Sequence, residues 1–348
     1  MTLEDLLLIM LCYVMFFIEL QLKCSSISSF IDYSEFDGSQ FICSGSEDKT
    51  VRVWDVETSK QIESFNGHSS EVYYDKTIRF WDFKNNQQLK IFNGHNHWVN
   101  GIKFSPFNGG RYLCSGSGDS TIRLWDVETS KALHIFNGHK DCVWCVDISP
   151  LQSSNNNNNN NNSIGVIGGN GYTICSGSYD TTIVIWDIET TKQLISFIGH
   201  VGSLRSVKYG SNEIGNIGCA NTILSGSGDN NVRLWDIRSG KKIQKFEGHD
   251  DRVMAVEYSP FVVNNGKFGD NSNVICSGSE DNTIRFWDIR SNRNELYSIE
   301  GDNNEDQGIL SFTFFPLQKD KKAHDNIKNS RGFNLCYGSG KGSIRIWG

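Results

Sequence analysis

The chain has 348 residues, of which 38% are hydrophobic and 21% charged, a balance that excludes a disordered chain and an integral membrane bundle. Its formal net charge is −7, with 33 Lys and Arg against 40 Asp and Glu, so it lacks the basic field that nucleic acid or an anionic membrane would attract. Nine tryptophans are unusual for this length, and their spacing predicts the fold.

Residues 1–22 differ from everything that follows them. Leu6–Ile18 is an apolar run of 13 residues between acidic residues. It is shorter than the roughly 20 residues of a membrane span, and its acidic start is unlike the positive start of a secretory signal. Three interpretations stay open, in this order: an error in joining exons, a closing strand at about Phe17–Leu22, and a membrane anchor.

From residue 23 onward, short motifs recur in a fixed order. Gly-His is followed by a Cys-Ser-Gly-Ser-x-Asp string in most copies, and then by Trp-Asp. The Trp-Asp pairs begin at Trp54, Trp81, Trp125, Trp186, Trp235 and Trp287, with Trp347-Gly348 as a seventh copy. The Gly-His pairs begin at Gly67, Gly94, Gly138, Gly199 and Gly248.

Each repeat predicts four short strands. In the third repeat these are residues 88–92, 99–104, 111–117 and 121–125, where β-branched and aromatic residues alternate with polar ones. One such sheet cannot bury both of its faces, whereas sheets stacked radially can, which predicts a closed ring.

The Gly-His to Trp-Asp unit resembles the WD-repeat β-propeller family (WD40-type, G-protein-β-like repeats) over about residues 25–348. The resemblance implies an all-β propeller, nominally of seven blades, in which the Gly-His loop and the Ser-Gly-Ser-x-Asp turn share one face, the top. We therefore expect residues 1–22 to be a separate apolar segment and residues 23–348 to form the propeller. An Asn-rich insertion at about 151–171 is expected to be disordered. Further insertions, near residues 209–222, 260–273 and 316–334, are expected on the opposite, bottom face.

The second repeat is shorter than the others. Val99 and Asp119 are 20 positions apart, whereas their counterparts Val72 and Asp75 are 3 apart, so 17 residues of the repeat are missing. They cover most of the first inner strand and all of the next. We expect a truncated second blade, caused either by mis-joined exons or by a real short blade. The first is preferred, because losing two inner strands leaves backbone groups unpaired.

A His, a Ser, an Asp and a Trp recur together and could be mistaken for a catalytic triad. Several equal copies argue against a single active site, so we expect a protein that is not an enzyme and that has no catalytic residue, metal or cofactor. The resemblance implies a buried hydrogen-bond network instead, in which each polar group has a partner. The four sets are His95, Ser115, Asp119 and Trp125; His139, Ser176, Asp180 and Trp186; His200, Ser225, Asp229 and Trp235; and His249, Ser277, Asp281 and Trp287.

The pattern weakens in the terminal repeats, which we expect to be the least stable. In the first, Cys24 stands at the position of His, with Ser44, Asp48 and Trp54 retained. In the last, Asp302, Tyr337 and Lys341 stand at the positions of His, Ser and Asp.

The cysteines predict no disulfide framework. Five of them (Cys43, Cys114, Cys175, Cys276 and Cys336) occupy one repeat position, where the fifth repeat has Leu224. Exchange with Leu indicates a small buried hydrophobe. Free thiols favour a reducing compartment, so the cytoplasm is the expected site, with the nucleus as the alternative. Cys142 and Cys145 form a C-x-x-C pair, which could be redox-active or half of a zinc site. Without a second ligand pair we favour two ordinary strand residues.

The resemblance also implies a function, that of a rigid scaffold whose top face binds partner proteins or peptides. Contacts in the family flank the first valine after Gly-His and the x of Ser-Gly-Ser-x-Asp, and Trp, Tyr and Arg dominate such interfaces. The candidate partner-binding residues are Trp98, Asn100, Trp144, Tyr179, Arg205, Arg252 and Met254. For Trp144, packing as a core residue remains an alternative. We expect a subunit of a larger complex, with no direct nucleic-acid partner and with membrane contact only if residues 1–22 are an anchor.

A second hypothesis rests on residues 223–238 and 275–290, which both end in Trp-Asp-Ile-Arg. They resemble a box found in propellers that deliver substrates to cullin-type ubiquitin ligases. Arg238 and Arg290 would each offer a forked donor to an acidic group of the adaptor. A propeller enzyme is a third, disfavoured alternative, since no repeat carries a titratable cluster that the others lack.

Overall fold

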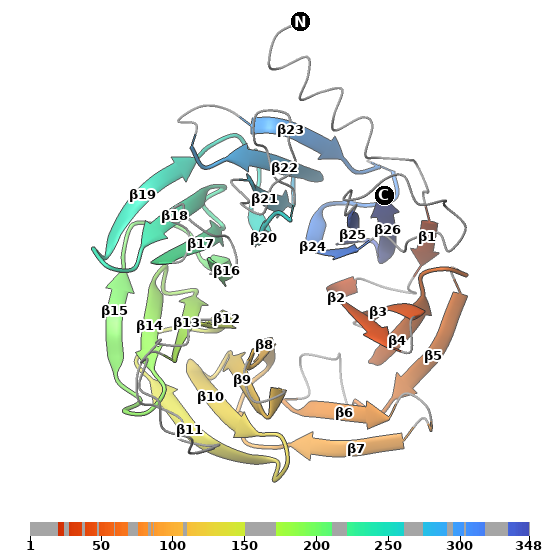
Figure 1. Cartoon of the computed structure of the whole chain (residues 1–348), viewed down its shortest axis with the longest axis horizontal. Helices are drawn as coiled ribbons and strands as arrows, with labels where there is room; N and C mark the ends of the chain where they lie inside the picture. The colour runs from red at the N-terminus through yellow and green to blue at the C-terminus, as the bar shows by residue number, and fades with distance from the viewer. Residues whose placement is uncertain are drawn as a thin grey trace, which may run out of the picture. The chain divides into compact units, whose positions relative to one another are not determined.

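The structure, a computed structural model, describes residues 20–23, 28–36, 39–46, 49–58, 60–68, 76–82, 85, 87–106, 110–149, 172–210, 221–260, 274–290, 295–302, 304–316 and 333–347. The apolar run Leu6–Ile18, Cys24, Asp48 and the Asn-rich insertion at about 151–171 lie outside these residues, as does most of the other three insertions. The regular elements of the described part are strands, β1 to β26 (Figure 1). Within it, no helix is long and apolar enough to cross a membrane.

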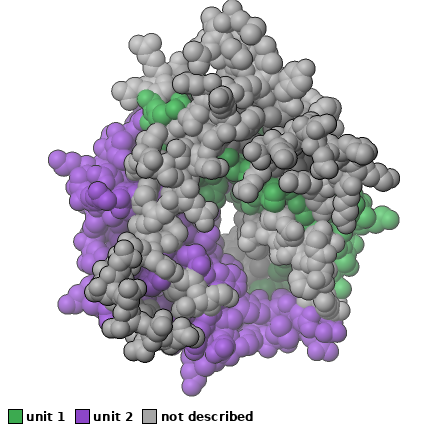
Figure 2. Space-filling model, in the orientation of Figure 1, with its two compact units in different colours: residues 1–72, 257–291, 295–348 green, residues 73–256, 292–294 purple. Residues whose placement is uncertain are grey.

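The chain divides into two compact units, shown in green and purple in Figure 2. Unit 1 comprises residues 1–72, 257–291 and 295–348, and unit 2 comprises residues 73–256 and 292–294. One of the boundaries between the units, after Val256, falls inside strand β20 (Val253–Tyr258).

Unit 1 contains two complete four-stranded sheets and three strands of a further one. Its first sheet has the order β2-β3-β4-β5, with strands Ser28–Phe36, Ser39–Ser46, Thr50–Asp55 and Lys60–Asn66. Its last sheet has the order β1-β26-β25-β24, with strands Leu20–Lys23, Ser343–Trp347, Phe333–Ser339 and Ile309–Pro316. The further strands are β21 (Val274–Ser279), β22 (Thr283–Asp288) and β23 (Glu295–Glu300).

The last sheet joins two distant parts of the sequence. β1 runs antiparallel to β26, with Leu20 opposite Ile346 and Lys23 opposite Ser343. Residues 20–23 thus occupy the outer-strand position beside the last Trp-containing strand, which is the position expected for a closing strand.

Unit 2 contains three four-stranded antiparallel sheets, and in each of them neighbouring strands are consecutive in the chain. The strands are β8 to β11 (Val99–Phe104, Tyr112–Ser117, Thr121–Asp126, Lys131–Asn137), β12 to β15 (Val143–Ile148, Thr173–Ser178, Ile183–Asp187, Gln193–Phe197) and β16 to β19 (Leu204–Tyr209, Thr222–Ser227, Val232–Asp236, Lys241–Phe246). The four strands predicted for the third repeat correspond to β7 to β10, with ends that differ by at most one residue.

The second repeat forms a two-stranded sheet, β6 (Ile78–Asp82) and β7 (Gln87–Phe92). Their register matches that of β10 and β11 in the next repeat: Ile78 lies opposite Phe92 as Ile122 lies opposite Phe136. The truncated second blade expected from the missing 17 residues is therefore the outer half of a sheet.

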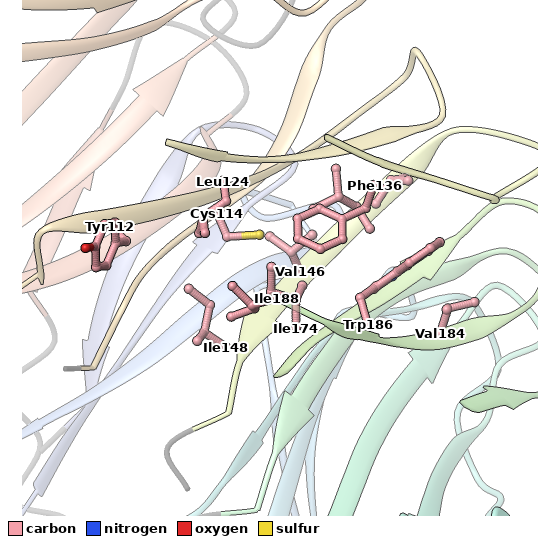
Figure 3. Packing of buried hydrophobic residues seen from close by; sticks show 12 residues of the cluster. Tyr112, Cys114, Leu124, Phe136, Val146, Ile148, Ile174, Val184, Trp186 and Ile188 are labelled. Atoms are coloured by element: carbon pink, nitrogen blue, oxygen red, sulfur yellow. The ribbon is translucent and has the colours of Figure 1, made fainter. Parts of the chain in front are cut away.

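Alternation of side chains along the strands builds the core between neighbouring sheets. In unit 2, buried residues of the β8–β11 sheet pack on buried residues of the β12–β15 sheet (Figure 3). Cys114, Leu124 and Phe136 come from the first sheet, and Val146 and Trp186 from the second. These side chains are apolar, so their burial between the two sheets stabilises the packing by roughly 25 cal/mol per Å² of apolar surface removed from water.

Candidate functional site

One set of four side chains comes together in the same way in three successive repeats of unit 2. In the third repeat, Trp125 Nε1 donates a hydrogen bond to Ser115 Oγ at 2.8 Å, and His95 Nε2 lies 2.7 Å from the same hydroxyl. His95 Nδ1 lies 3.0 Å from Asp119 Oδ2. The next two repeats have the same contacts at 2.7 to 2.9 Å, made by His139, Ser176, Asp180 and Trp186, and by His200, Ser225, Asp229 and Trp235.

Local structure fixes each member of the set. In the third repeat the histidine follows the outer strand β7, the serine lies on β9, and the tryptophan lies on β10. The turn between β9 and β10 carries the aspartate, whose backbone N–H donates to Ser117 Oγ at 3.1 Å. Ser117 in turn donates to the backbone carbonyl of His97 at 3.2 Å, which ties the turn to the loop that carries His95.

Hydrogen bonding determines the charge of the aspartate. Burial alone would raise the pKa of Asp119, but donors from His95, Thr121 and the Asn96 N–H hold it well below its ordinary value. The pKa values of Asp180 and Asp229 are lowered in the same way. An ionised carboxylate keeps the proton of the imidazole on Nδ1, so Nε2 accepts the hydroxyl proton of the serine.

This arrangement leaves no nucleophile for a substrate. Ser115, Ser176 and Ser225 are fully buried, and each hydroxyl bridges an imidazole and an indole. Burial also lowers the pKa of His200, against the opposing effect of Asp229, which favours the neutral imidazole. Three equal, closed networks satisfy buried polar groups and fix how the strands meet, which is a structural role.

Unit 1 contains the serine–tryptophan half of the same pattern in two repeats. Trp287 Nε1 donates to Ser277 Oγ at 2.8 Å, and Trp54 Nε1 donates to Ser44 Oγ at 3.1 Å. His249 of the sixth set is buried in unit 2. In the first repeat, Cys24 and Asp48 fall outside the described residues.

In the last repeat one sequence-based assignment is corrected: the side chain that takes the place of the histidine is not that of Asp302. The buried group there is Asp306, which accepts from Tyr337 Oη at 3.1 Å, from Arg345 Nε at 3.0 Å and from the Asp302 N–H at 2.7 Å. Lys341 lies outside this contact, with its Nζ donating to the Asn304 carbonyl at 2.7 Å. Burial and the charge of Asp306 raise the pKa of Tyr337, so the phenol stays protonated and donates. The last repeat therefore has a polar network of its own rather than a decayed one.

Three of the candidate partner-binding residues form a stack at the surface of unit 2, which we call the Arg205 cluster: Trp144, Tyr179 and Arg205. The rings of Trp144 and Tyr179 are stacked, with centroids 5.2 Å apart and an interplanar angle of 18°. The Arg205 guanidinium carbon lies 4.7 Å from each ring centroid, and Nη1 donates to Tyr179 Oη at 2.5 Å. All three side chains are partly exposed, so Trp144 is not a fully buried core residue.

The Arg205 cluster continues into the neighbouring loops through backbone contacts. The Tyr179 N–H donates to the Cys142 carbonyl at 2.9 Å, as the Gly118 N–H donates to the Trp98 carbonyl at 2.9 Å one repeat earlier. Asn100 Nδ2 donates to the Val143 carbonyl at 2.9 Å. Asn100 is thus held against β12 next to Trp144, whereas Trp98 is held by its backbone against the turn that carries Gly118, and both are partly exposed.

Two further candidates lie one repeat later in the chain. Arg252 is exposed just before β20, and its charge acts on Tyr179. Met254 is partly exposed on β20. Burial raises the pKa of Tyr179, and the neighbouring Arg205 and Arg252 oppose that rise. Both arginines therefore place positive charge close to the exposed edge of the stack.

The C-x-x-C pair has the wrong environment for redox chemistry. Burial raises the pKa of the Cys145 thiol to about 12. Burial and the neighbouring Asp141 raise the pKa of Cys142. A reactive dithiol needs a lowered pKa, so the two residues behave as strand and loop residues that happen to be three positions apart. None of the seven described cysteines forms a disulfide.

The two arginines of the cullin hypothesis have local partners. Arg290 donates to its own Asp288 from Nε and Nη2, at 3.1 Å each. The Arg238 guanidinium lies against the Asn221 amide, with Nη2 2.9 Å from the amide oxygen in the orientation that satisfies both groups. Both residues are exposed. In the ranges that the structure describes, no cluster of three or more His, Cys, Asp or Glu could hold a metal ion.

Comparison with known proteins identifies the family. The family model for the WD domain, G-beta repeat (WD40), matches residues 26–55, 86–126, 130–187, 191–236 and 240–288, more than half of the chain. The chain therefore belongs to the WD40 family, and the all-β WD-repeat β-propeller expected from the sequence is confirmed.

A curated relative gives a much shorter match. The general transcriptional corepressor tupA of Dictyostelium discoideum is 39% identical over 59 residues, which cover 14% of this chain and 10% of that protein. The match thus spans about a tenth of the relative's length.

Proposed function

We propose that the protein is a non-enzymatic scaffold that binds a partner protein or peptide through the Arg205 cluster and the residues beside it. The observation that carries this proposal is the stack itself: two aromatic rings and a guanidinium held together in a partly exposed position. WD40 propellers are typically protein-interaction scaffolds. The buried polar groups of the repeated networks bond to one another, so a partner would have to be bound by exposed side chains.

The stack supplies what a binding hot spot needs. Trp, Tyr and Arg offer large contact area with few rotatable bonds, and they dominate measured interface energies. Because Arg205 is already fixed by two rings and by Tyr179 Oη, little side-chain entropy is lost when a partner binds. Its remaining N–H groups and the exposed Arg252 favour an acceptor on the partner, such as a carboxylate or a backbone carbonyl.

The proposal places Trp98, Asn100 and Met254 at the edge of the contact. They are partly exposed; the Trp98 carbonyl accepts from the Gly118 N–H, and the Asn100 amide donates to the Val143 carbonyl of β12. Rim residues of this kind contribute less than the central stack, because water still reaches them. The compartment proposed is the cytoplasm, with the nucleus as the alternative that the short likeness to a transcriptional corepressor supports.

Affinity capture with a matched set of variants tests the proposal. The full chain, Arg205→Ala, Trp144→Ala and the control Ile198→Ala are used as baits in extracts of the source cells. Ile198 is exposed in unit 2 but follows an outer strand, so its loss should leave partners unchanged. We expect at least one partner to be lost with both cluster variants and retained by the control. Partners that bind all four baits equally would refute the proposed surface.

The cullin-receptor hypothesis has less support. Arg290 already makes a two-point contact with Asp288, which an adaptor carboxylate would have to displace. The cullin-receptor hypothesis predicts that baits with Arg238→Ala and Arg290→Ala no longer capture a cullin adaptor in the same experiment. Unchanged adaptor recovery would remove it.

A further inference from the structure

The polar side-chain groups that the Arg205 cluster leaves unpaired are hydrogen-bond donors. Trp144 Nε1 and Arg205 Nη2 have no hydrogen-bond partner among the described residues, and neither atom is buried. Tyr179 Oη already accepts from Arg205 Nη1, and burial raises the pKa of the phenol, so this group keeps a proton that it can donate. Indole and guanidinium groups have no acceptor. A group that binds at the cluster must therefore bring acceptors.

Arg205 has no carboxylate partner among the residues that the structure describes. Two other arginines of unit 2 differ in this respect. Arg111 Nη2 lies 3.2 Å from Asp126 Oδ2. Arg233 Nη2 lies 3.3 Å from Asp229 Oδ2. The described contacts of the Arg205 guanidinium are the two rings of the cluster and their one hydroxyl, so its counter-ion is left to be supplied from outside these residues.

Two arginines set the charge at the cluster, although the whole chain has a formal net charge of −7. Arg252 is exposed, and its charge acts on Tyr179 together with that of Arg205. The acids beside them are directed to the backbone: Asp141 and Asp251 each accept a hydrogen bond from the next N–H along the chain, at 2.7 and 2.8 Å. Because salt screens charges beyond about 8 Å at physiological ionic strength, a group in contact with the stack responds mainly to the nearby arginines.

We propose that the partner segment bound by the Arg205 cluster is acidic and presents an Asp or Glu carboxylate to Arg205 Nη2 and to the Trp144 indole N–H. This acidic partner rests on the proposed function, since the same surface binds it. A carboxylate has acceptors only and therefore matches the donors of the cluster. A basic segment would bring further donors and a like charge into contact with Arg205. Arg205 Nε is buried, and the few N–H groups left open favour one carboxylate over a phosphate with three acceptor oxygens.

Selection from a phage-displayed library of random short peptides tests the chemistry of the partner. The baits are the full chain, Arg205→Gln, Trp144→Ala and the control Arg111→Gln. Arg111 is a partly exposed arginine that already lies beside two carboxylates, those of Asp126 and Glu128, so its replacement should leave the selected peptides unchanged. We expect the full chain to enrich peptides with an Asp or Glu at one fixed position and to deplete Lys and Arg there. Both cluster variants should lose these peptides.

Fluorescence anisotropy then tests the acidic residue without any change in the protein. The most enriched peptide is labelled and titrated with the full chain, beside an analogue in which the amide (Gln for Glu, Asn for Asp) replaces the acid. We expect the analogue to bind about tenfold more weakly or worse, because a charge-assisted hydrogen bond is lost. With Arg205→Gln as the protein, the peptide and its analogue should bind equally weakly, because the charge that distinguishes them is gone.

The outcomes separate the acidic partner from the proposed surface. Peptides that Trp144→Ala loses but that show no acidic preference, or whose amide analogue binds as tightly, overturn the acidic partner and leave the proposed surface in place. Enrichment of Lys or Arg at the fixed position overturns the acidic partner as well. If the full chain selects no peptide that depends on Trp144 or Arg205, the acidic partner and the proposed function fail together.

Discussion

Replacing Ser176 by alanine removes one hydroxyl from the network of the fourth repeat. The hydroxyl oxygen accepts from Trp186 Nε1 at 2.8 Å and lies 2.7 Å from His139 Nε2. Its loss leaves an indole N–H and an imidazole nitrogen without their partner in a fully buried place. An unsatisfied buried polar group costs about 1–3 kcal/mol, so we expect a loss of roughly 2–5 kcal/mol in the free energy of unfolding.

Urea unfolding followed by tryptophan fluorescence measures this loss, with Ser196→Ala as the control. Ser196 is a partly exposed serine on β15, and its truncation should change the free energy of unfolding by less than about 0.5 kcal/mol. A double-mutant cycle with Trp186→Phe should show strong coupling, because each change removes the same hydrogen bond. If Ser176→Ala costs no more than the control, the bridging role of the serine is refuted.

Three further predictions concern other parts of the molecule. The lowered pKa values of Asp119, Asp180 and Asp229 imply stability that is fully present above the ordinary carboxyl pKa of 3.8 and is lost as the pH falls below it. Asp180→Asn should therefore reduce the dependence of the urea midpoint on pH between about 5 and 2. Asp306→Ala should destabilise the chain by about 3–5 kcal/mol in urea unfolding, because it removes the buried carboxylate of Arg345 and leaves its guanidinium only the exposed Glu305 as a carboxylate partner among the contacts described, and a loss below about 1 kcal/mol would contradict the last-repeat network. Gly177→Val should cost more than about 2 kcal/mol by thermal unfolding, since the new Cβ would meet Leu204 Cβ at 2.7 Å, whereas Ala at the exposed Glu189 should be tolerated.

The strands and the repeated networks were predictable because they depend on local pattern. Alternation of β-branched and polar residues sets the strands, and the fixed spacing from Ser115 to Trp125 puts the hydroxyl and the indole on adjacent strands. The same spacing of ten residues recurs in every set from Ser176 to Trp186 onward. Periodic spacing therefore carries enough information for a contact between neighbouring strands.

The last repeat was not predictable from that spacing. The sequence places Asp302 in line with the histidines, but a turn from Asp302 to Asp306, closed by the Asp306 N–H to the Asp302 carbonyl at 2.8 Å, moves the functional carboxylate four residues on. A usable signal was Arg345, which stands where Arg233 meets Asp229 at 3.3 Å in the fifth repeat. Loop geometry decides which acid reaches such an arginine, and residue spacing does not encode it.

The surface was predictable as a set of residues but not as an arrangement. Trp144, Tyr179 and Arg205 come from two repeats and a turn, and their stacking depends on the angle at which neighbouring strands meet. The exposure of Ile102 and Phe104 was also hidden, since both fit an ordinary buried strand pattern.

Hydrogen exchange of the tryptophan indole N–H groups, followed by NMR and assigned with Trp→Phe variants, tests most directly the division between a structural network and a binding surface. The indoles of Trp125, Trp186 and Trp235 should exchange only when their sheets open, whereas the partly exposed Trp144 should exchange fast and shift when a partner is added. Fast exchange at the three network indoles, or a partner that shifts them and leaves Trp144 unchanged, would contradict the assignment of roles.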